Sequence, residues 1–170
     1  MAQILKQGAL VNDPWTLLQP GDGETPAPVD LPPGDVLVPL AVWQARRAEL
    51  LARPGRCGLI LTGDDPLEEA AADLDHLAVI AVHFAKFADG RGYSLATLLR
   101  QRYGYRGELR AVGDVLHDQL FFLQRVGFDA FALRPEKDAA YALATGFTTF
   151  SERYQGASDQ PLPLFRRRTA

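Results

Sequence analysis

The fold is decided by residues 77–94, which read LAVIAVHFAKFADGRGYS. The first six residues are all apolar, and such a continuous run is typical of a strand covered on both faces of a parallel sheet. A polar turn with two glycines around Arg91 follows, and a helical pattern begins near Ser94, which we expect to cap the helix. The stretch therefore predicts a strand, a turn and a helix, in the order of a parallel β-α unit.

The same unit recurs along the chain. Short apolar strands are expected at residues 36–38, 58–61, 77–82, 108–112 and 129–133, and a helical pattern follows each of them. Consecutive β-α units form a mostly parallel sheet with right-handed crossovers. We therefore predict an α/β fold of about five β-α units, either an open doubly wound sheet or a half-barrel that a second copy completes. A closed eight-fold barrel needs about 250 residues, which exceeds this chain.

Composition divides the chain into three segments. Residues 1–34 are predicted to form an N-terminal arm, because residues 20–34 contain five prolines and three glycines. Two short strands are expected in this arm, at residues 4–5 and 15–18, and the arm lies either across its own domain or across a neighbouring subunit. Residues 35–155 form the α/β domain, and residues 156–170 form a flexible tail.

Charge and cysteine content exclude several classes of function. The net charge is −3, so no sequence-wide basic field attracts nucleic acid. Cys57 is the only cysteine, which excludes an intrachain disulfide and a paired-cysteine zinc site. No signal pattern and no apolar run of about 18–20 residues is present, so we expect a cytoplasmic protein without a membrane partner.

The turns that follow the predicted strands carry the candidate site, because the carboxyl ends of parallel strands meet at one edge of a sheet. Cations and a tyrosine in these turns are predicted to bind a small anion such as phosphate, sulfate or a carboxylate, and these are Lys86, Arg91, Tyr93 and Arg134. Asp89 and Asp114 are the candidate catalytic residues, as a general base. An alternative is that Arg91 only pins the loop through an ion pair with Asp89 or Asp114.

Other kinds of chemistry find no support in the sequence. No Gly-x-Gly-x-x-Gly and no Gly-Lys-Ser/Thr run follows any predicted strand, so no nucleotide cofactor is expected. Neither Ser94 nor Cys57 lies in a nucleophile elbow. His83 and His117 do not share one helix at ligand spacing, so we predict no metal site and no cofactor.

Four segments resemble a bacterial family of unknown function whose members are described as oxidoreductases involved in sulfite reduction. The segments are FAKFADGRGYSLA at 84–96, LRQR at 99–102, GELRAVGDVLHDQ at 107–119 and RVGFDAF at 125–131. The resemblance covers roughly residues 35–154, and it implies a role in assimilatory sulfite reduction with sulfite reductase as partner. A single cysteine cannot supply the four thiolates of an iron–sulfur cluster, which indicates an accessory role rather than the reductase itself.

Three functions therefore stay open at this point. The first is an accessory protein of sulfite reduction that binds a small anion or docks on sulfite reductase. The second is a small enzyme that acts on a carboxylate or phosphate substrate at the strand ends, and the third is a non-catalytic structural partner. The Pro-rich arm and the open edges of a five-unit sheet favour a homodimer.

Overall fold

The computed structural model describes residues 3–18, 30–134, 137–147, 150 and 152–167. It contains one eight-stranded sheet with the strand order β2-β1-β8-β7-β6-β5-β4-β3. The strands are β1 (Gln3–Lys6), β2 (Ala9–Asn12), β3 (Thr16–Leu17), β4 (Val36–Pro39), β5 (Cys57–Leu61), β6 (Val79–Phe84), β7 (Glu108–Gly113) and β8 (Ala130–Phe131). Strands β3 to β8 pair in parallel, whereas β1 runs antiparallel to both of its neighbours, β2 and β8. The predicted α/β class with a mostly parallel sheet is confirmed.

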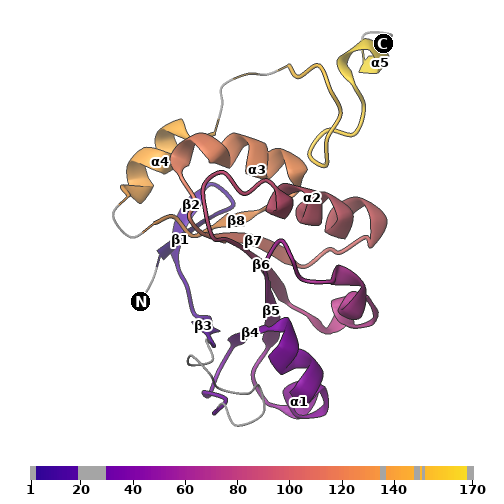
Figure 1. The fold of residues 1–170 in the computed structure, drawn as a ribbon. Coiled ribbons are helices and arrows are strands. Elements are labelled where there is room, and N and C mark those ends of the chain that lie inside the picture. Colours follow the sequence, from indigo (N-terminus) through magenta and orange to yellow (C-terminus); the bar gives the residue numbers. More distant parts are fainter. Residues whose placement is uncertain (1–2, 19–29, 135–136, 148–149, 151, 168–170) are drawn as a thin grey trace.

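The strand order distinguishes the half-barrel from the doubly wound sheet. Strands β4 to β8 lie side by side in sequence order, whereas a doubly wound sheet reverses its order at a switch point. Figure 1 shows helices along one side of the curled sheet and the chain between β2 and β3 on the other side. The helices are α1 (Leu40–Ala52), α2 (Arg91–Thr97), α3 (Leu120–Val126), α4 (Ala139–Thr145) and α5 (Leu164–Arg167), with short turns at η1 (Leu67–Glu69), η2 (Ala71–His76), η3 (Leu98–Arg102) and η4 (His117–Gln119).

Two local predictions about helices are corrected by the structure. Ser94 does not cap α2, because the helix already begins at Arg91 and the Asp89 carboxylate accepts the Arg91 N–H at 3.1 Å. The helical pattern expected after the strand at residues 58–61 is a pair of short 3₁₀ turns, η1 and η2. The helix expected after the strand at residues 129–133 is α4, which begins at Ala139 with Asp138 as its N-cap.

The two faces of the sheet are covered by different parts of the chain. On the helical face, alternating residues of the strands join the main core with side chains of α1, α2 and α3; examples are Val38, Leu59 and Ile80. On the inner face, Leu37, Val79 and Ala81 form a smaller cluster against which Trp15 packs. Because both faces are covered, the central strands are apolar without alternation.

The N-terminal strap, defined here as residues 12–15, crosses the inner face. It joins β2 at one edge of the sheet to β3 at the other edge. Asp13 in the strap pairs with the buried Arg110 of β7 at 2.7 Å. The Arg56 guanidinium lies 5.2 Å from the centre of the Trp15 ring. The described part of the predicted arm therefore lies across its own domain, whereas residues 19–29 are outside the described residues.

The strap also shows how strongly the sheet curls. In a flat sheet, seven strand spacings between β2 and β3 would span about 34 Å. The four Cα–Cα steps from Asn12 to Thr16 reach at most about 15 Å. The two edges must therefore approach each other, and the sheet forms a half-barrel whose inner face the strap bridges (Figure 1).

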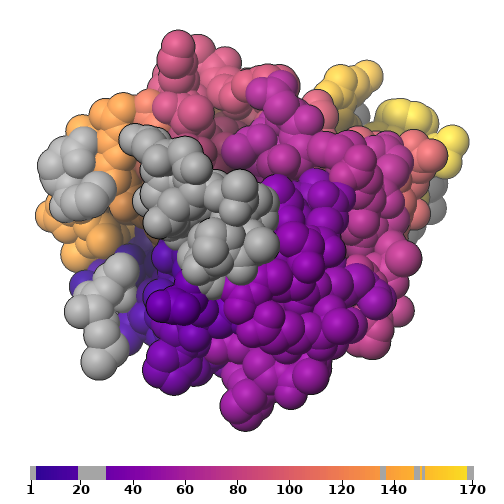
Figure 2. Space-filling model, turned by 60° about the horizontal axis from the view of Figure 1, so that its bottom comes forward, coloured from indigo at the N-terminus to yellow at the C-terminus, as the bar shows by residue number. Residues whose placement is uncertain are grey.

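The two ends of the described chain lie on opposite sides of the molecule. In Figure 2 the indigo N-terminal strands and the yellow C-terminal segment are separated by the strands and helices between them. Within the described residues, no helix is long and apolar enough to cross a bilayer.

Candidate functional site

The rim, defined here as the turns that follow β5, β6, β7 and β8, brings the predicted site residues onto one edge of the half-barrel. Arg91, after β6, pairs with Asp64, after β5. Asp114, after β7, accepts the Phe87 N–H at 2.8 Å and pairs with Arg134, after β8, at 2.6 Å. A continuous series of polar contacts therefore links all four turns. Among the residues that make these links, Asp64 and Phe87 are the two that were not predicted as site residues from the sequence.

Arg91 is held on two sides by carboxylates. Asp89 receives a forked pair of hydrogen bonds, from Arg91 Nε at 2.9 Å and from Nη2 at 2.7 Å, while Nη1 donates to Asp64. Gly63 is required for this approach, because a Cβ there would lie 2.6 Å from Arg91 Cβ. These hydrogen bonds lower the pKa of Asp89 to about 2. The contact of Arg91 with Asp89 is the loop-pinning pair that the sequence left open as an alternative.

Asp114 connects the turns after β6 and β7. Hydrogen bonding from Arg134, with a smaller contribution from the Phe87 N–H, lowers the pKa of Asp114. Its own N–H donates to Phe84 O at 2.7 Å. This close approach requires Gly113, which has a φ of +92° and where a Cβ would lie 2.5 Å from Phe84 O. Asp114 is therefore an ionised residue that holds the rim together.

Tyr93 and Lys86 occupy different environments on the same turn. The half-buried Tyr93 ring meets the Phe84 ring edge-on, with centroids 5.6 Å apart, and burial raises the pKa of Tyr93. Lys86 is exposed and forms no ion pair with any residue that the structure describes. The predicted residues therefore share one rim but differ in burial and contacts: Tyr93 is packed against Phe84, whereas Lys86 is exposed.

A groove adjoins the rim between α2 and α3, and we name it the rim groove. Its volume is about 690 Å³, and its walls include Phe87, Tyr93, Gln119, Phe122 and Val126. The Phe87 and Phe122 side chains are 46% and 58% exposed. This groove was not predicted from the sequence. The adjacent pair Phe121 and Phe122 in a helix whose inward positions are Leu120 and Leu123 was the signal that one phenylalanine faces solvent.

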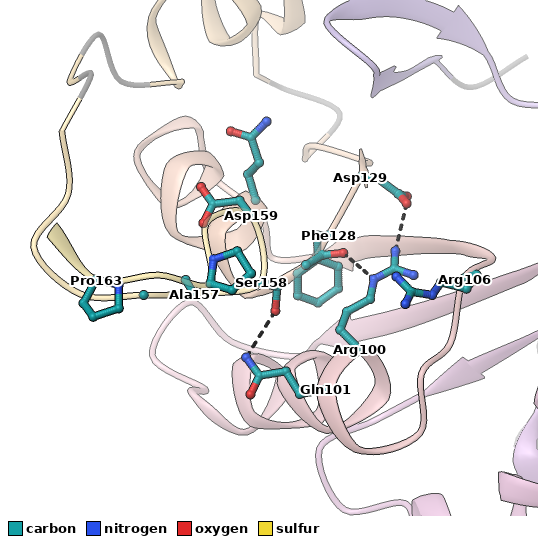
Figure 3. Close-up of a pocket in the computed structure, with 13 residues that line it drawn as sticks. Arg100, Gln101, Arg106, Phe128, Asp129, Ala157, Ser158, Asp159 and Pro163 are labelled. Atoms are coloured by element: carbon teal, nitrogen blue, oxygen red, sulfur yellow. Dashed lines mark hydrogen bonds and ion pairs between the residues drawn. The ribbon is translucent and has the colours of Figure 1, made fainter. Parts of the chain in front are cut away.

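A second hollow, here named the Arg106 cavity, lies at the opposite end of the sheet (Figure 3). It has a volume of about 740 Å³, and residues just before β7 and β8 form one wall while the C-terminal segment forms the other. Its labelled lining residues are Arg100, Gln101, Arg106, Phe128, Asp129, Ala157, Ser158, Asp159 and Pro163. None of the site residues predicted from the sequence lines this cavity.

The described side chains offer no candidate metal centre. Among them, no three histidine, cysteine, aspartate or glutamate residues gather closely enough to hold a metal ion. The Cys57 thiol is buried and lies 3.2 Å from Leu50 O, and burial raises the pKa of that thiol. A buried thiol of this kind behaves as a small apolar side chain.

Comparison with known proteins gives a family but no function. Residues 58–165 match the family described as bacterial protein of unknown function (DUF934). A search of curated proteins and a search of solved structures return no match. The matched range includes both the rim groove residues of α2 and α3 and the Arg106 cavity.

Proposed function

Because the chain belongs to the bacterial DUF934 family, whose function is unknown, we propose its function from the geometry of the rim. The protein acts as an accessory protein of assimilatory sulfite reduction. It docks on sulfite reductase through the rim and the rim groove. The choice of partner rests on the resemblance of four segments, one of which contains GRGYS at residues 90–94, to proteins described in terms of sulfite reduction.

The single observation that carries docking is the pair of exposed phenylalanines beside a pinned arginine. Phe87 and Phe122 flank a groove of about 690 Å³, and the Arg91 side chain next to it is 53% exposed. Exposed aromatic residues and arginine are the residue types that dominate protein interfaces. A rim already held by internal ion pairs also presents its side chains without a large ordering cost on binding.

The charge of the rim indicates what the partner surface carries. Aspartates outnumber cations in the described part of these turns: the aspartates are Asp64, Asp65, Asp89, Asp114, Asp118 and Asp138, and the cations are Lys86, Arg91, Arg134 and Lys137. A complementary partner surface is therefore basic, with an apolar side chain that enters the rim groove. We therefore expect the complex to bury a region of sulfite reductase with this chemistry.

Capture of a small anion at Arg91 is the second candidate function. The contacts with Asp89 and Asp64 use three of the five guanidinium N–H groups, so one N–H on Nη1 and one on Nη2 remain for an incoming anion, which would meet the Asp64 carboxylate beside them. The Asp64 side chain is 77% exposed, so it can be displaced. Sulfite binding that is lost in Arg91→Ala and strengthened in Asp64→Asn would favour this function over docking.

The geometry favours catalysis less. A carboxylate whose pKa lies near 2 is a weak proton acceptor at neutral pH, which applies to Asp89. Neither the rim groove nor the Arg106 cavity is lined by Asp89 or Asp114. Both aspartates are better suited to positioning the rim than to proton transfer.

We expect Phe122→Ala to weaken binding to purified sulfite reductase about tenfold or more, because truncation of a central aromatic anchor removes about 1.4 kcal/mol or more of binding free energy. Titration calorimetry with the full-length chain and the holoenzyme measures this loss. The control is Leu51→Ala, which truncates a 40% exposed side chain on α1. Absence of binding by the unsubstituted protein, or equal losses in both variants, contradicts docking through the rim.

The rim is also expected to respond to acid in a defined range. Arg91 holds the pKa of Asp89 in the folded protein at about 2. The contact between Asp89 and Arg91 therefore stabilises the fold fully above the unfolded-state pKa of Asp89, which is about 3.9. The contribution is lost as the pH falls from about 4 towards 2. The difference in melting temperature between the unsubstituted protein and Asp89→Asn should therefore stay constant from pH 8 to 5 and shrink below about 4. A difference that vanishes near pH 6 would contradict this assignment.

A further inference from the structure

The Arg106 cavity lies at the end of the sheet opposite the rim and shares only Gly156 and Ala157 with the rim groove, so its function is argued separately from docking. Its volume of about 740 Å³ is within the range of small-molecule sites. It combines cationic, amide, hydroxyl and apolar groups from three parts of the chain: residues 100–106, residues 124–129 and residues 156–163. These segments converge only in the folded protein (Figure 3).

Arg106 is the cation in this cavity that is left for a ligand. It is exposed, and of all the arginines in the described ranges it alone has no hydrogen bond, ion pair or ring contact with another described residue. Figure 3 shows its side chain beside that of Arg100 on one wall. A guanidinium without an internal partner can give two parallel hydrogen bonds to a carboxylate or a phosphate group.

Arg100 fixes the turn that presents Arg106. Its Nη1 donates to Tyr105 O at 2.7 Å and to Gly107 O at 2.9 Å, the carbonyl groups on either side of Arg106. Its Nη2 donates to Asp129 at 2.8 Å, and its Nε donates to Gly127 O at 2.9 Å. The turn is therefore preorganised, and the charge of Arg100 is balanced by Asp129.

The opposite wall is fixed in a similar way. The Ser158 N–H donates to Arg125 O at 2.9 Å, and the Ser158 hydroxyl donates to Val126 O at 3.1 Å. Asp159 pairs with Arg125 and Arg153, so its negative charge is compensated and does not repel a bound anion. Both aspartates of the cavity are thus neutralised by ion pairs, and Arg106 dominates its electrostatic potential.

We propose that the Arg106 cavity binds a small organic anion, with Arg106 contacting its carboxylate or phosphate group. The rings of Pro161 and Pro163 line the remainder of the cavity and accommodate an apolar body, while the Phe128 ring is buried in the core against Phe84. The amides of Gln101 and Gln124 provide hydrogen bonds to polar substituents. An inorganic anion would leave most of this apolar wall without contact.

Binding of three matched probes tests the proposal: phenyl phosphate, benzoate and the neutral benzyl alcohol. Saturation-transfer NMR and calorimetry on the full-length protein should detect at least one of the two anions, with benzyl alcohol at least tenfold weaker. Arg106→Ala should weaken anion binding at least tenfold, and Arg106→Lys should retain part of it. Binding of benzoate alone identifies a carboxylate ligand, and binding of phenyl phosphate alone identifies a phosphate ester.

Arg102→Ala is the control for general charge effects, because Arg102 is also exposed and, among the described residues, its guanidinium contacts only the Tyr103 ring. An unchanged melting temperature for Arg106→Ala establishes that the variant is folded. Binding of neither anion, or equal anion binding by the unsubstituted protein and Arg106→Ala, overturns the proposal. The outcome is independent of docking, since Phe122→Ala should leave probe binding unchanged and Arg106→Ala should leave binding to sulfite reductase unchanged.

Discussion

Substitution of Arg110 by alanine is expected to lower the free energy of unfolding by about 3–5 kcal/mol, the typical cost of leaving a buried charge without its partner. The Arg110 side chain is 2% exposed and pairs with Glu108 at 2.6 Å and with Asp13 at 2.7 Å. Lys6 also contacts Glu108, so the uncompensated charge after the substitution resides mainly on Asp13. Because Asp13 belongs to the N-terminal strap, we expect the strap to detach from the inner face.

Urea denaturation measures this loss, and two further variants test its cause. Glu49→Ala removes a surface ion pair with Arg46 and should cost less than about 1 kcal/mol. The double variant Asp13→Asn with Arg110→Met removes both charges of the strap contact together and should recover part of the stability lost in Arg110→Ala. A loss below about 1 kcal/mol for Arg110→Ala would mean that the strap does not depend on this ion pair.

Substitution of Phe84 by alanine is expected to destabilise the protein by about 3–5 kcal/mol, as for other buried phenylalanines. Phe84 is 2% exposed, and its ring contacts the rings of Tyr93 and Phe128 with centroids 5.6 and 5.9 Å away. Gly92 at the start of α2 lies against the same ring, since a Cβ there would be 2.6 Å from Phe84 Cζ. The resulting void would lie directly beneath the turn that carries Arg91.

Phe87→Ala is the matched comparison, because the same side chain is removed three residues further along the turn. Phe87 is 46% exposed, so its removal should change stability by no more than about 0.5 kcal/mol. It should nevertheless weaken binding to sulfite reductase, because Phe87 lines the rim groove. Thermal unfolding and calorimetry together separate the two effects. Equal stability losses in both variants would contradict the assigned burial of these two residues.

Most of the sheet could be predicted because its signals are local. The apolar run at residues 77–82 and its four counterparts contain the β-branched and aliphatic residues that a covered parallel strand needs. The observed strands β4 to β8 fall on these runs. Helix starts were less accurate, because Asp89 reaches across Gly90 to the Arg91 N–H and moves the start of α2 ahead of Ser94.

Only the candidate site that follows directly from the order of the strands could be predicted from the sequence. The turns after consecutive parallel strands meet at one edge, which placed Arg91, Asp114 and Arg134 on the same rim. The rim groove and the Arg106 cavity depend instead on the C-terminal segment. Ser158 is bonded to Arg125 and Val126 at the end of α3, and no sequence pattern indicates where a segment without regular structure will pack.

Local signals were enough to predict the α/β class, the succession of β-α units and the polar turns at the strand ends, because apolar periodicity and glycine placement act over a few residues. Three features emerge only in the folded protein: the sheet curls into a half-barrel, the strap crosses its inner face, and Arg106 is left without a described partner. These features depend on contacts between residues far apart in the chain, such as Asp13 with Arg110. The curl of the sheet follows from the short strap: a strap that reaches at most about 15 Å can join the two outer strands only if the sheet bends to bring them together.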